Sequence, residues 1–302
     1  MADEWVIETN GLGRRYGTRW VVQDLSLRVA RGAVYGFLGL NGAGKSTTIR
    51  MLMGLIRRHA GQAAVLRLDP ARAGVRIKRR VGYVAEQPAF YDWMRVGEIC
   101  AFAAYYRAGA WLPKRANDLI QRFRLPREAR LRDLSKGQRA KTALVLALAF
   151  DPELLILDEP TSGLDPVARR EFVEGVLAEF QESGKTIFVS SHLVNELSGL
   201  VDHVGILHEG RLLLSQPADD FTASVRRIRL SFEGEAPRQI RCAGMLRCQA
   251  DGREAVVSVR DFDEQKTVAE LRALGPLGLE IESLSLEDAF VEFVSGAERG
   301  AL

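Results

Sequence analysis

The order of apolar and polar residues predicts an α/β protein. Two segments near the start, 5–9 and 21–29, alternate in the manner of strands, whereas 34–38 and 154–157 are continuous apolar runs. Continuous runs of this length are typical of strands covered on both faces of a parallel sheet. We also expect strands at 61–66, 81–84, 186–190, 204–207 and 211–214, and helices at 48–53, 76–80, 142–150, 167–183 and 193–201.

Between residues 88 and 133 the spacing of the apolar residues is helical. One stripe there consists of Ile99, Phe102, Ala103 and Tyr106, and a second consists of Leu119, Ile120, Phe123 and Leu125. We expect the aromatic stripe either in a core or against a partner, and it carries no cofactor chemistry.

The residues after about 220 change in character and predict a small C-terminal α+β domain, 221–302, beside a first domain at 1–220. Strands are expected at 228–232, 255–259 and 279–284, and helices at 266–274 and 286–293. In the last helix Ala289, Phe290 and Phe293 are expected to face inward. Support of a dimer and regulation are both open as roles of this domain.

Composition excludes several classes of protein. The longest apolar stretch, 143–150, is far shorter than the ~20 residues that span a bilayer, and the acidic opening at 1–4 does not predict a secretory signal. Cys100, Cys242 and Cys248 form no CxxC pair, so neither a disulfide framework nor a zinc site is indicated, and we expect a reducing cytoplasm.

Charge is distributed unevenly along the chain. Residues 221–302 hold 11 of the 42 Lys and Arg and 14 of the 39 Asp and Glu, so the net charge is −3 there and +6 over residues 1–220. This favours an anionic ligand or an anionic membrane surface near the first domain. The excess is too small to indicate nucleic acid.

A glycine-rich loop lies between the apolar run 34–38 and the helix that follows. Its residues are Gly39, Leu40, Asn41, Gly42, Ala43, Gly44, Lys45, Ser46 and Thr47. Glycines let successive N–H groups converge on anionic oxygens, and a helix N-terminus adds partial positive charge. Lys45 supplies a charge for β- and γ-phosphates, and the Ser46 hydroxyl can coordinate Mg²⁺. The loop therefore predicts a nucleotide-phosphate site.

Polar residues end two of the expected central strands. Asp158 and Glu159 follow the run 154–157, and His192 follows the strand 186–190. Open α/β sheets bind ligands at this edge, although a lone histidine is more often structural. Tyr16 lies in an expected turn, where it can cap a small sheet or stack on a base.

The motifs in chain order resemble those of the nucleotide-binding subunit of ABC transporters, over nearly all of residues 3–220. Ser135 is placed to cap the helix that begins near residue 136, and Leu134 to Gln138 matches the family's signature. The other matching elements are Tyr16, Gly39 to Thr47, Gln87, Leu154 to Glu159, Ser162 to Asp165, and His192. The resemblance implies a P-loop NTPase with an antiparallel β subdomain and a helical subdomain at about 88–150.

The resemblance also implies a set of roles that suit phosphoryl transfer to water. Lys45 and the loop amides would hold ATP, and Tyr16 would stack on adenine. Ser46, Gln87 and Asp158 would hold Mg²⁺. Glu159 would be the general base, with His192 at the γ-phosphate.

By the same resemblance, one chain holds only half of each site. Ser135, Gly137 and Gln138 would reach the nucleotide of a second ATP-binding subunit, with Asp165 at the same seam. The loop at Gln87 and residues 88–133 would touch a separate transmembrane permease, at the cytoplasmic face of the membrane. The residues expected at that contact are Arg79, Arg80, Tyr91, Trp93 and Met94, and a packing role for Trp93 is equally open.

Lys136 departs from the family, which usually has glycine at this position. A lysine there can aid binding of a partner's γ-phosphate or crowd the closed dimer. The C-terminal segment 284–290 is similar to the end of drug- and antibiotic-export ATPases, so the favoured function is the ATPase subunit of an exporter. The alternatives are the ATPase of a membrane regulatory complex, and a chromosome- or translation-type relative, which usually carries a coiled coil, a zinc module or a second ATPase domain.

Overall fold

The computed structural model describes residues 5–107, 109–183, 185–237 and 239–299, without the side chains of 177–183 and 196. The acidic opening at 1–4 lies outside these residues. Contacts divide the chain into two compact units, one of Met1–His192 with Gly205–Ser215 and one of Leu193–Val204 with Gln216–Leu302. The boundary expected near residue 220 falls within α7, Ala218–Ser224, and the segment before residue 205 groups with the C-terminal part.

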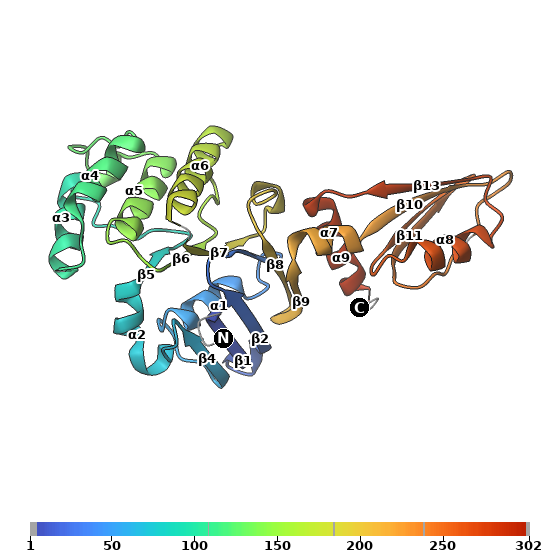
Figure 1. Ribbon diagram of the computed structural model, residues 1–302, viewed down its shortest axis with the longest axis horizontal. Helices are drawn as coiled ribbons and strands as arrows, with labels where there is room; N and C mark the ends of the chain where they lie inside the picture. Colours follow the sequence, from blue (N-terminus) through green and yellow to red (C-terminus); the bar gives the residue numbers. More distant parts are fainter. Residues whose placement is uncertain (1–4, 108, 184, 238, 300–302) are drawn as a thin grey trace. The chain divides into compact units, whose positions relative to one another are not determined.

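A six-stranded sheet is the centre of the first unit (Figure 1). In spatial order it contains β5 (Val81–Val84), β6 (Leu154–Asp158), β7 (Thr186–Ser191), β3 (Val34–Leu38), β8 (His203–His208) and β9 (Arg211–Pro217). The first four of these strands pair in parallel, and every residue of β3, β6 and β7 is buried, as the continuous apolar runs predict. The ring of Phe188 lies between Tyr35 and Phe37, at centroid distances of 5.5 and 5.2 Å.

A second, antiparallel sheet forms the predicted β subdomain. Its order is β2 (Arg19–Ala30), β1 (Trp5–Tyr16), β4 (Ala60–Val65). β1 is longer than expected because it pairs with β2 up to Tyr16, opposite Arg19. The turn is therefore confined to Gly17 and Thr18.

Helices on either side of the glycine loop complete the first unit. α1 (Lys45–Leu52) begins three residues earlier than expected, directly after Gly44, and α2 (Pro70–Arg80) precedes β5. α6 (Pro166–Ser183) runs between β6 and β7, as predicted. In the described part of the chain, no helix has both the length and the apolar character needed to cross a bilayer.

The helical subdomain contains α3 (Val96–Tyr106), α4 (Pro113–Arg122), a 3₁₀ turn (Leu131–Asp133) and α5 (Lys136–Leu148), which gather at one end of the first unit (Figure 1). The stripe of Leu119, Ile120, Phe123 and Leu125 is buried. The aromatic stripe is not a core stripe, because Phe102 and Tyr106 are exposed.

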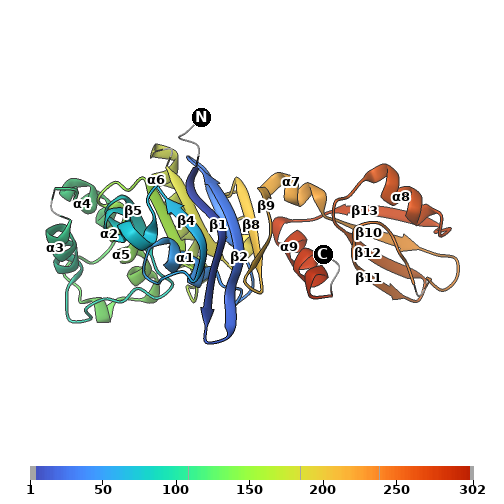
Figure 2. The same ribbon diagram turned by 90° about the horizontal axis from the view of Figure 1, so that it is seen from below.

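The second unit is an α+β fold. Its sheet has the order β11 (Met245–Asp251), β12 (Glu254–Val259), β10 (Arg226–Ser231), β13 (Gly278–Ser283), and α8 (Glu264–Arg272) lies along one face (Figure 2). α9 (Leu286–Glu298) packs on β11, where Gly296 lies against Leu246, and its Phe293 meets Phe221 of α7 edge to face. β11 and α7 were not expected from the sequence, because neither has clear periodicity.

The helix expected at 193–201 is wrong. Only a 3₁₀ turn forms there, Val194–Glu196, and the following N–H groups of Leu197 and Leu200 bond three residues back. Gly199 has a φ of 75°, which an α-helix does not contain. The apolar spacing of this segment was therefore a set of turns that bury Val194 and Leu197.

Candidate functional site

The predicted phosphate loop, 39–47, joins β3 to α1 at the carboxyl end of the parallel strands. Gly42 and Gly44 have φ values of 81° and 109°, which residues with side chains adopt only under strain. A Cβ on Gly39 would lie 2.5 Å from the carbonyl oxygen of Leu207, so close packing also demands glycine there. Because α1 starts immediately after Gly44, its free N–H groups and positive end face the loop, which suits an anion.

Lys45 is buried, and its ammonium group lies over the loop. Nζ donates hydrogen bonds to the carbonyl oxygens of Gly39, at 2.6 Å, and Leu40, at 3.2 Å. The same Nζ lies 2.9 Å from Oε1 of Glu159. The loop carbonyls and one carboxylate therefore hold the charge that the sequence assigns to phosphate binding.

Glu159 follows β6 and is buried, with a left-handed φ of 47°. Its Oε2 lies 2.7 Å from Nδ1 of His192, which anchors one side of the carboxylate. Within the described residues, Oε1 is buried without a hydrogen bond, so its 2.9 Å contact with Lys45 is purely ionic. Oε1 can therefore accept a proton or a hydrogen bond from a bound water once Lys45 turns to phosphate.

Asp158 ends β6 beside the loop. Its Oδ1 accepts hydrogen bonds from Ser46 Oγ, at 2.9 Å, and from Ser190 Oγ, at 3.0 Å. Burial raises the pKa of Asp158, and the two hydroxyl bonds partly offset this. A carboxylate next to a serine hydroxyl is the hard-oxygen pair that Mg²⁺ prefers. The described residues contain no cluster of three or more His, Cys, Asp or Glu that could hold a metal ion.

Lys45, Ser46, Glu159 and His192 line a pocket of about 350 Å³. The sequence did not identify Glu86, Val21 and Ser162 as part of it, although Glu86 was signalled by its position next to Gln87 and Ser162 by the element Ser162 to Asp165. The lining residues are Val21, Asn41, Gly42, Gly44, Lys45, Ser46, Thr47, Glu86, Glu159, Ser162 and His192.

Gln87 and Tyr16 lie outside this lining, as do four other residues of the predicted phosphate and metal site, namely Gly39, Leu40, Ala43 and Asp158. Gln87 is exposed on the loop after β5. Tyr16 is 49% exposed at the end of β1, with the guanidinium of Arg14 4.7 Å from the centre of its ring. The structure therefore gathers the phosphate and base candidates with two of the metal candidates, Ser46 and Asp158, and leaves Gln87 and Tyr16 exposed.

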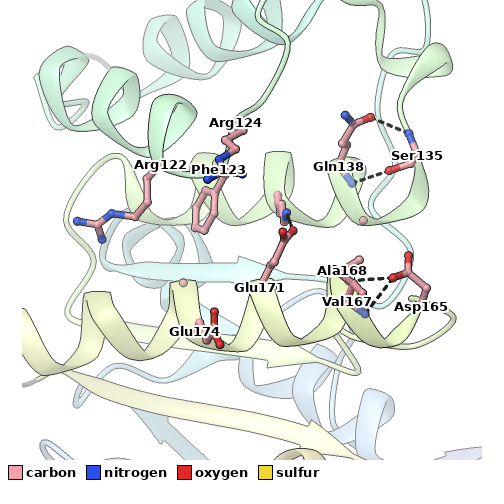
Figure 3. Close-up of a pocket in the computed structure, with 13 residues that line it drawn as sticks. Arg122, Phe123, Arg124, Ser135, Gln138, Asp165, Val167, Ala168, Glu171 and Glu174 are labelled. Atoms are coloured by element: carbon pink, nitrogen blue, oxygen red, sulfur yellow. Dashed lines mark hydrogen bonds and ion pairs between the residues drawn. The ribbon is translucent and has the colours of Figure 1, made fainter.

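The signature residues lie at a second pocket, of about 610 Å³, between α5 and α6 (Figure 3). Ser135 and Gln138 cap α5 reciprocally: Ser135 Oγ accepts from the Gln138 N–H at 3.2 Å, and Gln138 Oε1 accepts from the Ser135 N–H at 3.0 Å. Deeper in the same pocket Lys141 forms an ion pair with Glu171. This pocket and the phosphate pocket have no lining residue in common.

Asp165 caps α6 at the other side of the second pocket. Its Oδ1 accepts from the N–H groups of Val167, at 3.0 Å, and Ala168, at 2.9 Å, as Figure 3 shows. These two bonds lower the pKa of Asp165, with the bond from Ala168 the larger cause. The carboxylate is thus oriented by its own helix.

Gly137 and Lys136 differ in what surrounds them. A Cβ on Gly137 would lie 2.7 Å from Cβ of Ala168, so glycine allows α5 to approach α6. Lys136 is exposed, and its Nζ lies 3.7 Å from the position that a Cβ of Gly163 would occupy. The lysine therefore extends over the 160–166 loop of its own chain.

The fold and the phosphate pocket define a P-loop nucleotide-binding protein. The family model described as ABC transporter matches residues 22–162. The bacitracin transport ATP-binding protein BcrA of Bacillus licheniformis is 33% identical over 98% of this chain and 99% of its own length. A fluoroquinolones export ATP-binding protein of Mycobacterium tuberculosis is 36% identical over 76% of this chain and 77% of its own.

A solved structure described as the ATP-binding subunit of an ABC transporter superposes with a TM-score of 0.65 at 30% identity, covering 72% of this chain and 92% of that chain. The chain belongs to the ABC transporter family. It is an ATP-binding, ATP-hydrolysing subunit of the exporter type.

Proposed function

We propose that this subunit pairs with a second ATP-binding subunit around ATP, and that the resulting closure drives export through a separate transmembrane permease. The observation that carries the proposal is the separation of its two pockets, which have no lining residue in common. A chain that holds phosphate chemistry in one pocket and the signature in another is completed by a partner that offers the missing half.

At the phosphate pocket, Lys45 and the loop N–H groups bind the β- and γ-phosphates. Ser46 and Asp158 hold Mg²⁺, which neutralises phosphate charge when bound. Oε1 of Glu159, which gives up its ion pair with Lys45 when phosphate binds, accepts the proton of the attacking water. His192 fixes the carboxylate through Oε2 and meets the γ-phosphate.

At the signature pocket, the capped start of α5 presents its N–H groups and positive end to the nucleotide bound by the partner subunit. Ser135, Gly137 and Gln138 form this surface. The capping box leaves Ser135 Oγ able to accept and donate further hydrogen bonds. Asp165 lies at the same seam, and Tyr16 and Gln87 are the candidates for adenine and metal contacts.

A row of exposed aromatic side chains on the helical subdomain supports a permease partner. The rings of Trp93, Tyr91, Phe102, Tyr106 and Tyr105 follow one another at centroid distances of 6.1, 5.7, 4.8 and 5.4 Å. Trp93, Tyr105 and Tyr106 are 67%, 78% and 71% exposed. Contiguous exposed apolar surface of this kind marks an interaction site. A subunit docked there lies at the cytoplasmic face of the membrane.

Two other residues expected at the permease contact are less available. Met94 is buried. Arg80 is held by a two-pronged ion pair with Glu153, with N–O distances of 2.5 and 2.8 Å. The proposed contact therefore relies on the row of aromatic side chains, and Arg79 is exposed as well.

A mixing experiment tests the paired site. Glu159→Gln removes the base but keeps the signature, whereas Ser135→Arg blocks the signature but keeps the base. Neither variant hydrolyses ATP alone. In a one-to-one mixture half of the dimers are mixed, and each has one intact composite site, so activity returns to about a quarter of the wild-type value.

The control is a mixture of Glu159→Gln with the double variant, which contains no intact site. Recovery in this control, or substantial hydrolysis by Ser135→Arg alone, would contradict a site shared between subunits. Recovery that requires a different co-expressed ATP-binding subunit would assign a heterodimer instead of a homodimer.

A further inference from the structure

Ser190 lies on the strand that neighbours Asp158 and contacts both Asp158 and Glu159. It lies on β7 directly beside Asp158 of β6 in the parallel register and is completely buried. Its hydroxyl donates to Asp158 Oδ1 at 3.0 Å and lies 3.1 Å from the N–H of Glu159, from which it accepts. One hydroxyl therefore joins both residues, and no motif in the sequence indicated this.

The Glu159 backbone at this point has an unfavourable conformation. Its φ of 47° is left-handed, which is costly for a residue with a side chain. The N–H of Glu159 is shared between the carbonyl oxygen of Ser190, at 3.2 Å, and the Ser190 hydroxyl. These bonds help to hold the turn that directs the carboxylate of Glu159 into the pocket.

Asp158 Oδ1 accepts hydrogen bonds from two hydroxyl groups, and a bound metal ion would compete for one of them. Ser46 lines the phosphate pocket and is the proposed metal ligand, so its hydroxyl is not reserved for Asp158. Ser190 is not among the residues that line the pocket, and its hydroxyl bonds to Asp158 and to the N–H of Glu159. When Ser46 turns to a metal ion, the bond from Ser190 still fixes the rotation of the Asp158 carboxylate.

We propose that Ser190 is a positioning residue that couples the metal carboxylate Asp158 to the base Glu159 through one hydroxyl. The proposal rests on the proposed roles of these two carboxylates. Removing the hydroxyl leaves both residues present but loosens their mutual geometry. The loss falls on metal binding and on turnover, and it leaves the binding of metal-free ATP by the glycine loop unaffected.

The test compares three substitutions. Ser190→Ala removes the hydroxyl, Ser190→Cys keeps the approximate volume with a much weaker donor, and Ser190→Thr keeps the hydroxyl. The alanine and cysteine variants lose or weaken a hydrogen bond to a charged group, so we expect their kcat to fall by about tenfold. We expect kcat of Ser190→Thr to lie within about threefold of the wild-type value. This difference is smaller than the one that the loss of a hydrogen bond to a charged group causes.

Metal binding supplies a readout that does not depend on turnover. In the Glu159→Gln background with ATP bound, Mn²⁺ titrated by electron paramagnetic resonance should half-saturate at about tenfold higher concentration for Ser190→Ala and Ser190→Cys. ATP affinity measured in EDTA should stay within about twofold of the parent value. Ser258→Ala, which removes a buried strand hydroxyl from the other unit, is the matched control and should leave all three quantities unchanged.

Wild-type kcat and Mn²⁺ affinity in Ser190→Cys would overturn the proposal, as would a folded Ser190→Thr that fails to recover them. An equal loss of metal-free ATP affinity would show a general structural role instead. If Ser190→Ala is unstable in thermal unfolding, the cysteine and threonine pair still decides. Asp158→Asn tests the underlying assignment separately, because normal Mn²⁺ binding in that variant would refute the metal role of Asp158 itself.

Discussion

Lys45 Nζ lies 2.9 Å from Glu159 Oε1, and both side chains are less than a tenth exposed. The ammonium that is suited to phosphate thus neutralises the carboxylate that is suited to act as base. A triphosphate at the loop competes with Glu159 for this ammonium. With the role proposed for Glu159, the pairing ties release of the base to arrival of the substrate, because phosphate oxygens in the loop offer the lysine an equivalent charge.

The first prediction concerns this carboxylate. Glu159→Gln keeps the shape of the side chain but removes its charge, so Lys45 is free for phosphate and ATP binding is kept or strengthened. Turnover falls at least a hundredfold, because a general base contributes that much or more. Hydrolysis, ATP affinity and molar mass by light scattering are measured together, and an ATP-bound dimer is expected to accumulate.

Glu86→Gln is the matched control, since it makes the same change at another residue that lines the same pocket. We expect it to retain most of the hydrolysis. Normal turnover in Glu159→Gln would remove Glu159 from the role of base.

The second prediction concerns the signature. Ser135→Arg should abolish hydrolysis while the monomer still binds ATP, because Ser135 lies in a different pocket from Lys45. The substitution also removes an N-cap, which costs about 1 kcal/mol of stability. Ser285→Arg removes the N-cap of α9 in the other unit and so reproduces that cost without touching the signature. Loss of ATP binding in the Ser135→Arg monomer would refute the assignment of the signature to a partner's site.

The fold of the first unit followed from local patterns. The continuous apolar runs at 34–38 and 154–157 predicted the buried parallel strands, and the glycines predicted the phosphate loop, although α1 begins at Lys45, three residues before its expected start. Contacts between distant segments were not predictable in this way. The bond from Ser190 to Asp158 depends on which strands are neighbours, and the exposure of Phe102 depends on how α3 packs. Periodicity marks an apolar face, but it does not say whether another element covers it.

The third prediction tests the close approach of α5 and α6. Gly137→Ala places a Cβ 2.7 Å from Cβ of Ala168, so the start of α5 must move and hydrolysis should fall by about tenfold or more. Ala168→Gly removes the atom that clashes. The double variant is therefore expected to recover much of the lost activity, measured as kcat alongside thermal unfolding. A double variant as impaired as Gly137→Ala would show that the small residue serves something other than helix packing.

The fourth prediction concerns stability against acid. The hydrogen bond from Arg58 lowers the pKa of Asp69 to about 2, so the pair stabilises the fold above the ordinary pKa of an aspartate and loses this effect as the pH falls from about 4 to about 2. Because the Asp69 side chain is nearly one-third exposed, we expect a contribution of only about 1 kcal/mol.

Asp69→Asn isolates this effect, because asparagine preserves the N-cap of α2. Unfolding of the first unit should be easier for the variant than for the wild type at pH 7, and the difference should shrink at pH 3. Glu8→Gln, which breaks an exposed pair with Arg28, is expected to change little at either pH. An Asp69→Asn difference that is equal at both pH values would mean that the ion pair is not its source.

The last prediction concerns the row of aromatic side chains on α3 and the loop before it. Trp93→Ser combined with Tyr105→Ser removes two highly exposed rings that do not contribute to the core. The isolated subunit should therefore keep its ATP affinity, its hydrolysis and its thermal stability. If these aromatic side chains dock on a permease, the amount of variant that co-purifies with the co-expressed membrane partner should fall by about tenfold or more. Substitution of central aromatic residues in an interface has an effect of this size. Trp5→Ser, an exposed tryptophan on β1, is the control and should leave co-purification intact. Unchanged co-purification of the double variant would place the permease contact on another surface, whereas equal loss in both variants would indicate a general effect of removing surface aromatics.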